Sequence, residues 1–291
     1  HARPASGFAI AARVRRSDRI SAGAETSAGD SVTSSPRAME RAAASSVESG
    51  RAMLGQFDGQ TLDLSEIHRF PNTPARLPSG MHWDILRLWN EIKQGISQAN
   101  QKTQGQLASI GLDTWGVDFG LLDKNGVLIG NPYQYRDSRT DGMLEEAFRR
   151  VPRAEVYAQT GIQFMFFNSV YQLLSMVVAQ SPALEIAQTF LTVPDLLNYW
   201  LSGRKVCEFS NTTTTQCYDP RQKDWAWPLL QQLGIPTHIF PEVVQPGTVL
   251  GDLLPSVRDD IGLRNAIPII APACHDTGSA VAAVPARGSN F

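Results

Sequence analysis

The pattern of apolar and polar positions in the first part of the chain predicts a sheet and a helix. Residues Arg51–Phe57 and Thr61–Phe70 are typical of two strands, and Asp58-Gly59 between them is a hairpin signal. The next segment, His82–Ile96, changes to a helical period, with apolar residues at spacings of four, three and four. A continuous apolar run over Leu107–Asp113 then predicts a buried strand.

The pattern beyond this strand predicts a return strand and then a mainly helical region. Lys124-Asn125-Gly126 is a turn signal that should bring Val127–Ile129 back beside the central strand. We therefore expect an α/β domain with a mixed sheet. The later helix candidates are Asp141–Arg150, Arg153–Thr160, Ser169–Gln180, Pro194–Leu201 closed by Gly203, and Trp225–Leu233 stopped by Gly234. Ile267–Ala273 is the last strand candidate, and the small residues of Thr277–Val284 predict a tightly packed helix.

The first 44 residues differ in composition from the rest of the chain. They are rich in Ala, Ser, Arg and Gly and have almost no apolar periodicity. We therefore predict a disordered tail over residues 1–44 and one domain over residues 45–291. The Arg-rich opening loosely resembles a targeting segment but lacks the apolar core of a secretory signal. Deleting the predicted tail should leave the thermal midpoint unchanged.

Length and composition exclude several classes of protein. The chain has 291 residues, of which 42% are hydrophobic and 19% charged, as in soluble globular proteins. The formal net charge of −2 gives no reason to expect nucleic acid or a membrane surface as partner. A run of about 18 apolar residues, as a transmembrane helix needs, does not occur. The three cysteines have no Cys-x-x-Cys spacing, so we expect neither a zinc site nor a disulfide framework. We expect a reducing, cytoplasmic location.

Polar side chains follow the central strand, where Asp113, Trp115, Gly116 and Asp118 fall close together. In open α/β sheets, ligands bind at the carboxyl ends of strands. Trp115 offers a flat apolar face for a sugar ring, and Asp113 and Asp118 offer acceptors for its hydroxyls. Gly116 has no side chain, so a ligand can approach its backbone, and a valine there should block the sugar. The alternative is a hairpin loop with solvated acids.

A second polar segment, His275-Asp276, follows the last strand and precedes the small-residue helix. The free N–H groups of a helix N-terminus favour a bound anion such as phosphate. A carboxylate at this junction can accept the proton of an alcohol that attacks that phosphate. In the alternative interpretation Asp276 only caps the helix and His275 is a packed histidine. The residues alone leave both interpretations open.

A hydroxyl-rich tract, Asn211–Thr215, lies between the predicted helices. It fits a surface turn and a ligand-facing segment equally well. Its first three residues also fit a glycosylation sequon, which we treat as chance because no signal peptide is expected. The sequence does not decide between the turn and the ligand-facing segment.

Taken together, these segments resemble the FGGY carbohydrate kinase family. Two signatures are specific to its L-rhamnulose branch: Asp-Thr-Trp-Gly-Val-Asp-Phe at residues 113–119 and His-Asp-Thr at residues 275–277. The similarity runs in the family's order from about Ser49 to the C-terminus. The matching segments are Ser109–Asp123, Tyr135–Thr140, Thr160–Phe164, Val170–Leu173, Pro194–Gly203, His275–Pro285 and, more weakly, Asn211–Gln216.

The resemblance implies an α/β domain of the actin-like, ribonuclease-H-like type, with a mixed sheet and flanking helices. It also implies a kinase that uses ATP and Mg²⁺ to phosphorylate L-rhamnulose at its 1-hydroxyl. Asp276 matches the catalytic base, and Gly116, His275, Asp276 and Thr277 match substrate contacts. The expected partners are thus the sugar and ATP, with neither nucleic acid nor membrane. We expect a monomer or a weak oligomer, and no resident metal ligands.

The chain departs from the family at its two ends. The family's first phosphate loop reads roughly Asp-Leu-Gly-Ala-x-Ser-Gly-Arg, and its tail survives here in Val47, Glu48, Ser49, Gly50 and Arg51, which the resemblance assigns to the nucleotide. Ala44 and Ser46 stand at the positions of its Asp and first Gly. Alanine cannot help to hold a metal ion. In the family a second domain with the adenosine pocket follows, so we expect this chain to be the sugar-binding half.

Two alternatives accompany this expectation. A degenerate relative would bind a ketose without transferring phosphate. Another FGGY kinase would act on xylulose, fuculose or glycerol, which the Asp-Thr-Trp-Gly signature disfavours. A Gly-Thr phosphate loop in sequence beyond Phe291 would favour the kinase over the degenerate protein.

Overall fold

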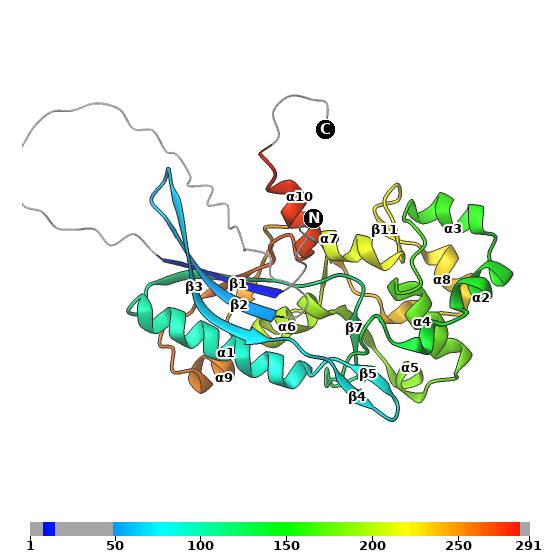
Figure 1. The fold of residues 1–291 in the computed structure, drawn as a ribbon, viewed down its shortest axis with the longest axis horizontal. Coiled ribbons are helices and arrows are strands. Elements are labelled where there is room, and N and C mark those ends of the chain that lie inside the picture. The colour runs from blue at the N-terminus through cyan, green and yellow to red at the C-terminus, as the bar shows by residue number, and fades with distance from the viewer. Residues whose placement is uncertain (1–7, 15–48, 286–291) are drawn as a thin grey trace, which may run out of the picture.

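The computed structural model describes residues 8–14 and 49–285, and a six-stranded sheet forms its centre (Figure 1). Its strands are β1 Phe8–Val14, β2 Ser49–Phe57, β3 Leu62–Pro71, β6 Leu107–Asp113, β13 Val249–Asp252 and β14 Pro268–Ile270. Across the sheet they follow the order β13-β14-β6-β1-β2-β3. β14 with β6 and β1 with β2 are parallel, whereas the other neighbours are antiparallel. The predicted mixed sheet is therefore confirmed.

Three segments of the chain meet at one edge of this sheet. β6 and β14 are parallel and end there, so the chain after each strand leaves from the same edge. Across β1, Ala9 lies opposite Asp113 at the end of β6, and the neighbouring Phe8 lies opposite Gly50 at the start of β2. The edge thus gathers both polar motifs and the start of β2.

Two helices lie side by side against the sheet. α1, Ile85–Lys102, packs on β1, β2 and β3, and α6, Val193–Ser202, packs on β6, β13 and β14. Their rings Trp89 and Trp200 meet edge to face, with centroids 5.5 Å apart. The side chain of Asp84 accepts from the backbone N–H of Arg87, which is an N-cap for α1. Burial of their apolar faces fixes both helices on the sheet.

Of the other helices, α2, α3, α4, α5 and α8 gather on the side of a second, two-stranded sheet, away from β1–β3, whereas α9 lies next to α1 (Figure 1). That sheet pairs β7, Phe119–Leu122, with β8, Thr189–Thr192. Besides α1 and α6, the described helices are α2 Met143–Arg150, α3 Arg153–Thr160, α4 Ser169–Val178, α5 Pro182–Ile186, α7 Phe209–Thr212, α8 Trp227–Leu233, α9 Pro255–Asp260 and α10 Asp276–Ala282. The shorter elements are β4 Ala75–Leu77, β5 Gly80–His82, η1 Ser138–Thr140, β9 Cys207–Glu208, η2 Thr213–Thr215, β10 Tyr218–Asp219, β11 Asp224–Trp225, η3 Thr237–Ile239 and β12 Val243–Val244.

Most elements lie where the sequence predicts them. A helix is observed at each position where one was predicted in the middle region. Gly203 and Gly234 end two of these helices with φ of 79° and 75°, as left-handed C-caps require. α1 continues six residues past the predicted end at Ile96 because Ala99 still packs in the core. In the part of the chain that the structure describes, no helix is both long and apolar enough to cross a membrane.

Three predictions about elements are wrong. Residues Phe8–Val14, assigned to the disordered tail, form β1 inside the central sheet; the rest of that predicted tail lies outside the described residues. Residues Val127–Ile129 do turn back, but beside β7 and through a single bridge, Leu128 to Leu122, so they form no return strand next to the central strand. The helix after Asp276 is not tightly packed, since Val281 and Val284 are exposed.

The position of β1 reverses the expectation for the N-terminal segment. β1 has six paired positions with β2 and six with β6, so its removal opens the sheet between them. Each lost backbone hydrogen bond is worth about 0.5–1.5 kcal/mol, and the total is of the order of a domain's stability. We predict that deleting residues 1–14 abolishes the cooperative thermal transition, whereas deleting residues 1–7 preserves it. An unchanged midpoint after the longer deletion would show that β1 is dispensable.

Candidate active site

The backbones of the two polar motifs lie side by side at the edge of the central sheet. The N–H of Thr114 donates to the carbonyl of Cys274, and the N–H of Asp276 donates to the carbonyl of Thr114, each at 3.0 Å. Thr114 and His275 form a parallel bridge between the two segments. The Asp113–Asp118 loop and the His275–Thr277 segment, separated by more than half the chain, therefore form one site.

Asp276 is buried, with 1% of its surface exposed, at the first position of α10. Its Oδ1 accepts from the N–H and the hydroxyl of Thr277, at 2.6 and 3.1 Å. Burial raises the pKa of its carboxyl to about 7, against the lowering effect of both Thr277 bonds. Oδ1 thus bonds an N–H of the first turn of α10, as a capping side chain does, whereas His275, the residue before the helix, makes no such bond. A carboxylate with a pKa near the working pH suits a general base.

The two neighbours of Asp276 are more exposed than Asp276 itself. The ring Nε2 of His275 lies 3.9 Å from Oδ1 of Asp276, and desolvation lowers the pKa of this histidine. Thr277 is exposed while its hydroxyl bonds Asp276. The neutral imidazole and the hydroxyl are the polar groups that this segment presents beside the carboxylate.

Asp118 is buried completely and holds two indoles together. Its Oδ2 accepts from Nε1 of Trp83 at 2.6 Å and of Trp115 at 2.9 Å, while Oδ1 accepts from the amide of Gln172 at 3.1 Å. A further bond to Oδ2 comes from the N–H of Tyr135 at 3.3 Å. Burial raises the pKa of Asp118 to about 6, and the bonds from both indoles and Gln172 lower it.

These contacts change the interpretation of Trp115 and Asp118. Three protein donors bond Oδ2 of Asp118 and one bonds Oδ1, and the side chain is buried completely. Trp115 is buried as well and stacks on Trp83, with centroids 4.3 Å apart. Direct contact of either side chain with a sugar stays a prediction. What the structure shows is a buried support beneath the loop.

Tyr135 lies close to both acids and was not singled out by the sequence. Burial is the main cause of its raised pKa, and the charges of Asp118 and Asp276 raise it further. Its ring is half-buried and contacts that of Phe167, at 5.6 Å between centroids. The only sequence signal for it was its place in the Tyr135–Thr140 segment that matches the family.

A side chain at position 116 would have no room, for a reason that the sequence did not reveal. A Cβ at Gly116 would lie 2.9 Å from Oγ1 and 3.0 Å from Cβ and Cγ2 of Thr214. A valine there would collide with Thr214, and the expectation that it also blocks the sugar stays a prediction. This threonine belongs to the hydroxyl-rich tract, in which Asn211, Thr212 and Thr215 are buried. Because these residues are buried, the interpretation of the tract as a surface turn is wrong.

The residues assigned to the nucleotide are only partly described. Ser49, Gly50 and Arg51 open β2, at the same sheet edge as Asp113, and Nε of Arg51 lies 3.7 Å from Glu66. The other positions of the expected phosphate loop, Ala44, Ser46, Val47 and Glu48, lie outside the described residues. Among the described residues, no three His, Cys, Asp or Glu side chains form a group that could hold a metal ion. The described residues of the loop therefore lie at the same sheet edge as the site and belong to no such group.

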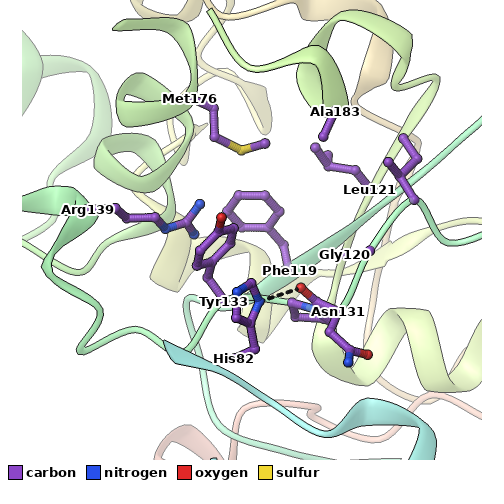
Figure 2. A pocket seen from close by; sticks show the side chains of 12 residues that line it. His82, Phe119, Gly120, Leu121, Asn131, Tyr133, Arg139, Met176 and Ala183 are labelled. Carbon is purple, nitrogen blue, oxygen red and sulfur yellow. Dashed lines mark hydrogen bonds between the residues drawn. The ribbon is translucent and has the colours of Figure 1, made fainter. Parts of the chain in front are cut away.

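A cavity of about 200 Å³ lies beside β7, and Figure 2 shows the side chains that line it. Of the predicted site residues that the structure describes, none lines this cavity. Its Arg139 stacks on Tyr133, 3.9 Å from the ring centroid, and donates to Oε1 of Gln172 at 2.6 Å. Since Gln172 also bonds Asp118, the cavity is connected to the site through two side chains.

The raised pKa of Asp276 predicts the pH dependence of stability. The folded carboxyl titrates near 7 and the unfolded one near 3.8, so the folded state holds the proton more tightly. This contribution is complete below pH 3.8 and is lost as the pH rises through 7. Asp276→Asn keeps an Oδ1 for Thr277 but does not titrate. We predict that the unfolding free energy of the variant rises relative to wild type from pH 4 to 7 and then stays level.

The measurement is denaturant unfolding across this pH range. Asp63→Asn, on the exposed side of β3, is the control and should run parallel to wild type. If the Asp276→Asn curve instead approached wild type from above as the pH rose, the folded state would favour the carboxylate, and Asp276 would not be poised near neutral pH.

Comparisons with known proteins agree with this arrangement. Residues 50–283 match the N-terminal domain of the FGGY family of carbohydrate kinases. The chain is 42% identical over 243 residues to Rhamnulokinase of Oceanobacillus iheyensis, covering 84% of this chain and 51% of that relative. It is 44% identical over 243 residues to Rhamnulokinase of Bacteroides thetaiotaomicron, covering 84% and 50%. The chain thus spans about half the length of the curated relatives it matches.

Solved structures share the fold. The chain matches a carbohydrate kinase from Novosphingobium aromaticivorans with a TM-score of 0.68 at 21% identity, over 81% of this chain and 49% of that one. It matches xylulose kinase from Rhodospirillum rubrum with a TM-score of 0.66 at 19% identity, over 78% and 47%. The expected actin-like, ribonuclease-H-like architecture is confirmed. On the match to residues 50–283 and these relatives, the chain belongs to the FGGY family of carbohydrate kinases.

Proposed function

We propose that this chain is the sugar-binding half of a kinase that transfers phosphate from ATP to the 1-hydroxyl of L-rhamnulose. The observation that carries the proposal is Asp276, a buried carboxyl with a pKa of about 7 beside the Thr114–Gly116 loop. Relatives named Rhamnulokinase at about 40% identity support the choice of sugar. The function proposed is that of a protein that includes the counterpart of the relatives' second half.

In the proposed mechanism Asp276 positions the sugar hydroxyl and takes its proton. The freed oxygen then forms a bond to the γ-phosphorus of ATP, while the bond from that phosphorus to the β,γ-bridging oxygen breaks and ADP leaves. The products are L-rhamnulose 1-phosphate and ADP. Such chemistry depends on positioning and charge stabilisation more than on covalent steps. Mg²⁺ bound with ATP would neutralise the phosphate charge.

The other site residues have supporting roles in this proposal. His275 and Thr277 lie next to the base and are partly or fully exposed, so they can reach hydroxyls of the sugar. Gly116 belongs to the same loop, two residues after Thr114, and Asp118 supports this loop through its bond to the indole of Trp115. Ser49, Gly50 and Arg51 lie at the same sheet edge and fit a contact with phosphate from that side. Val47 and Glu48 are proposed, from the resemblance alone, to contact the nucleotide.

Two competing functions differ from this one in testable ways. A degenerate relative would bind the ketose without transferring phosphate even in the longer protein. A kinase for another sugar, such as xylulose or glycerol, would show the opposite order of affinities. The xylulose kinases of known structure match at identities that support only the fold, whereas the relatives of higher identity support L-rhamnulose. A cytoplasmic location and a monomeric or weakly oligomeric state complete the proposal.

The first test of the proposal is sugar binding by this 291-residue chain. Calorimetric titration with L-rhamnulose should give binding at least about tenfold tighter than with xylulose or glycerol, which corresponds to about 1.4 kcal/mol. A coupled assay should show little or no ATP turnover, because we place most of the nucleotide site in the counterpart of the relatives' second half. Turnover at an ordinary kinase rate of about 1–100 s⁻¹, or equal affinity for all three sugars, would refute this division of labour.

The second test concerns the base, in the protein extended by the relatives' second half and with an intact first phosphate loop. Asp276→Asn keeps the oxygen that Thr277 bonds but removes the proton acceptor. We predict that kcat falls by about 10²–10⁴-fold while KM for L-rhamnulose changes less. Near-normal kcat with a lowered thermal midpoint would give Asp276 a structural role and remove the base from the mechanism.

A further inference from the structure

Asn211, at the start of the hydroxyl-rich tract, bonds the backbones of both site segments. Its buried side-chain amide donates to the carbonyl of Trp115 at 3.2 Å and to the carbonyl of Cys274 at 3.3 Å. Trp115 immediately precedes Gly116, and Cys274 lies two residues before Asp276. One amide group therefore spans the distance between the loop and the segment that carries the proposed base.

Thr214 holds the same loop on the other side of Gly116. Its hydroxyl donates to the carbonyl of Asn211 at 2.8 Å and accepts from the N–H of Val117 at 3.0 Å. Asn211 thus fixes the residue before Gly116 and Thr214 the residue after it. The lack of a side chain at Gly116 is what leaves room for Thr214.

Glu208, just before this tract, fixes the segment that carries Asp276. Its wholly buried carboxylate accepts from the N–H of Cys274 at 3.0 Å and from the N–H of Asn211 at 3.2 Å. The hydroxyl of Ser210 bonds the same carboxylate and accepts from the N–H of His275 at 3.2 Å. Burial raises the pKa of Glu208 and these bonds lower it. Glu208, Ser210, Asn211 and Thr214 thus all bond site backbone.

Val117 shows that the loop is held in a conformation it would not adopt alone. Its φ of 69° is left-handed, which is rare and costly for a β-branched residue. Besides Thr214 on its N–H, the hydroxyl of Ser169 and the amide of Gln172 donate to its carbonyl, at 2.5 and 3.2 Å. Such strain costs about 1–3 kcal/mol and persists where the surroundings over-determine it, often at functional sites.

We propose that Glu208–Thr214 is a clamp that sets the spacing between the Gly116 loop and Asp276, with Asn211 and Thr214 as positioning residues. The inference rests on the function proposed above, because it is the sugar that must fit between these two segments. It assigns to the tract a role in ligand affinity that acts through backbone placement and requires no contact with the ligand.

The test uses Asn211→Leu in the full 291-residue chain. Leucine has the branching of asparagine but no donor, so both clamp bonds are lost. Each carbonyl keeps another donor: the hydroxyl of Thr114 bonds that of Trp115 at 3.0 Å, and the N–H of Thr114 bonds that of Cys274. Among the described residues, Oδ1 of Asn211 has no hydrogen-bond partner, so its loss leaves no orphaned group. Folding should therefore survive.

Asn198→Leu is the matched control. Asn198 is equally buried, and its Oδ1 also has no partner among the described residues. Its amide contacts the sulfur of Cys274 at 3.9 Å and no backbone of the loop. The two variants make the same substitution in the same neighbourhood, and only one of them breaks the clamp.

Two readouts separate positioning from a general loss of stability. Titration with L-rhamnulose should show affinity reduced at least about tenfold in Asn211→Leu and less than about twofold in Asn198→Leu, where tenfold corresponds to about 1.4 kcal/mol. Hydrogen exchange should accelerate about tenfold at the amides of Val117 and Asp276 in the first variant only, as local opening predicts. Denaturant midpoints should be similar in both.

Equal losses of affinity in the two variants, at equal stability, would overturn the clamp. If the wild-type chain binds no L-rhamnulose, the proposed function fails, and hydrogen exchange alone then decides the clamp. Unchanged exchange at the Val117 and Asp276 amides of Asn211→Leu would overturn it in that case, and selective acceleration there would support it.

Discussion

The site depends on two backbone hydrogen bonds of Thr114. One ties its N–H to Cys274 and the other ties its carbonyl to Asp276, so residues more than half the chain apart in sequence become neighbours. These bonds lie beyond the ends of both β6 and β14, and Thr114 is paired there with His275, two residues further along than the pairing of Ile110 with Ile269 would place it. Placement of the proposed base thus depends on these two bonds as well as on the strands, and their loss would free Asp276 from the loop.

Burial of acids is the electrostatic cost of this arrangement. Asp118 and Asp276 lie almost out of contact with solvent, and burial raises the pKa of each above its usual range. For Asp118 the cost is offset by two indole donors, an amide and a backbone N–H. For Asp276 the N–H and the hydroxyl of Thr277 lower the pKa against burial. The first acid supports the loop, and the second is poised to accept a proton.

The sequence predicted what local periodicity and junctions encode. The strand Leu107–Asp113 and the helix Arg153–Thr160 lie at their predicted residues, and the meeting of both motifs at one sheet edge follows from parallel strands. β1 was missed because Phe8–Val14 contains three alanines, which are poor strand formers, and its partners come from distant residues.

The support of the site could not be predicted in the same way. The bonds of Asn211 and Thr214 join a side chain to backbone about 60 or about 100 residues away, and no local pattern encodes such a contact. Asp118 looked like a solvated loop acid because its donor Trp83 lies 35 residues earlier. A glycine between Trp115 and a β-branched residue was the available signal of close packing, but it fitted a ligand as well as Thr214.

The most direct test of this account is a crystal structure of the Asp276→Asn chain with L-rhamnulose. The account predicts the sugar between the Gly116 loop and residue 276, with its 1-hydroxyl within hydrogen-bond reach, about 2.6–3.2 Å, of that side chain. A sugar bound elsewhere, for example in the cavity beside Arg139, or bound here with its 1-hydroxyl turned away from residue 276, would contradict the account.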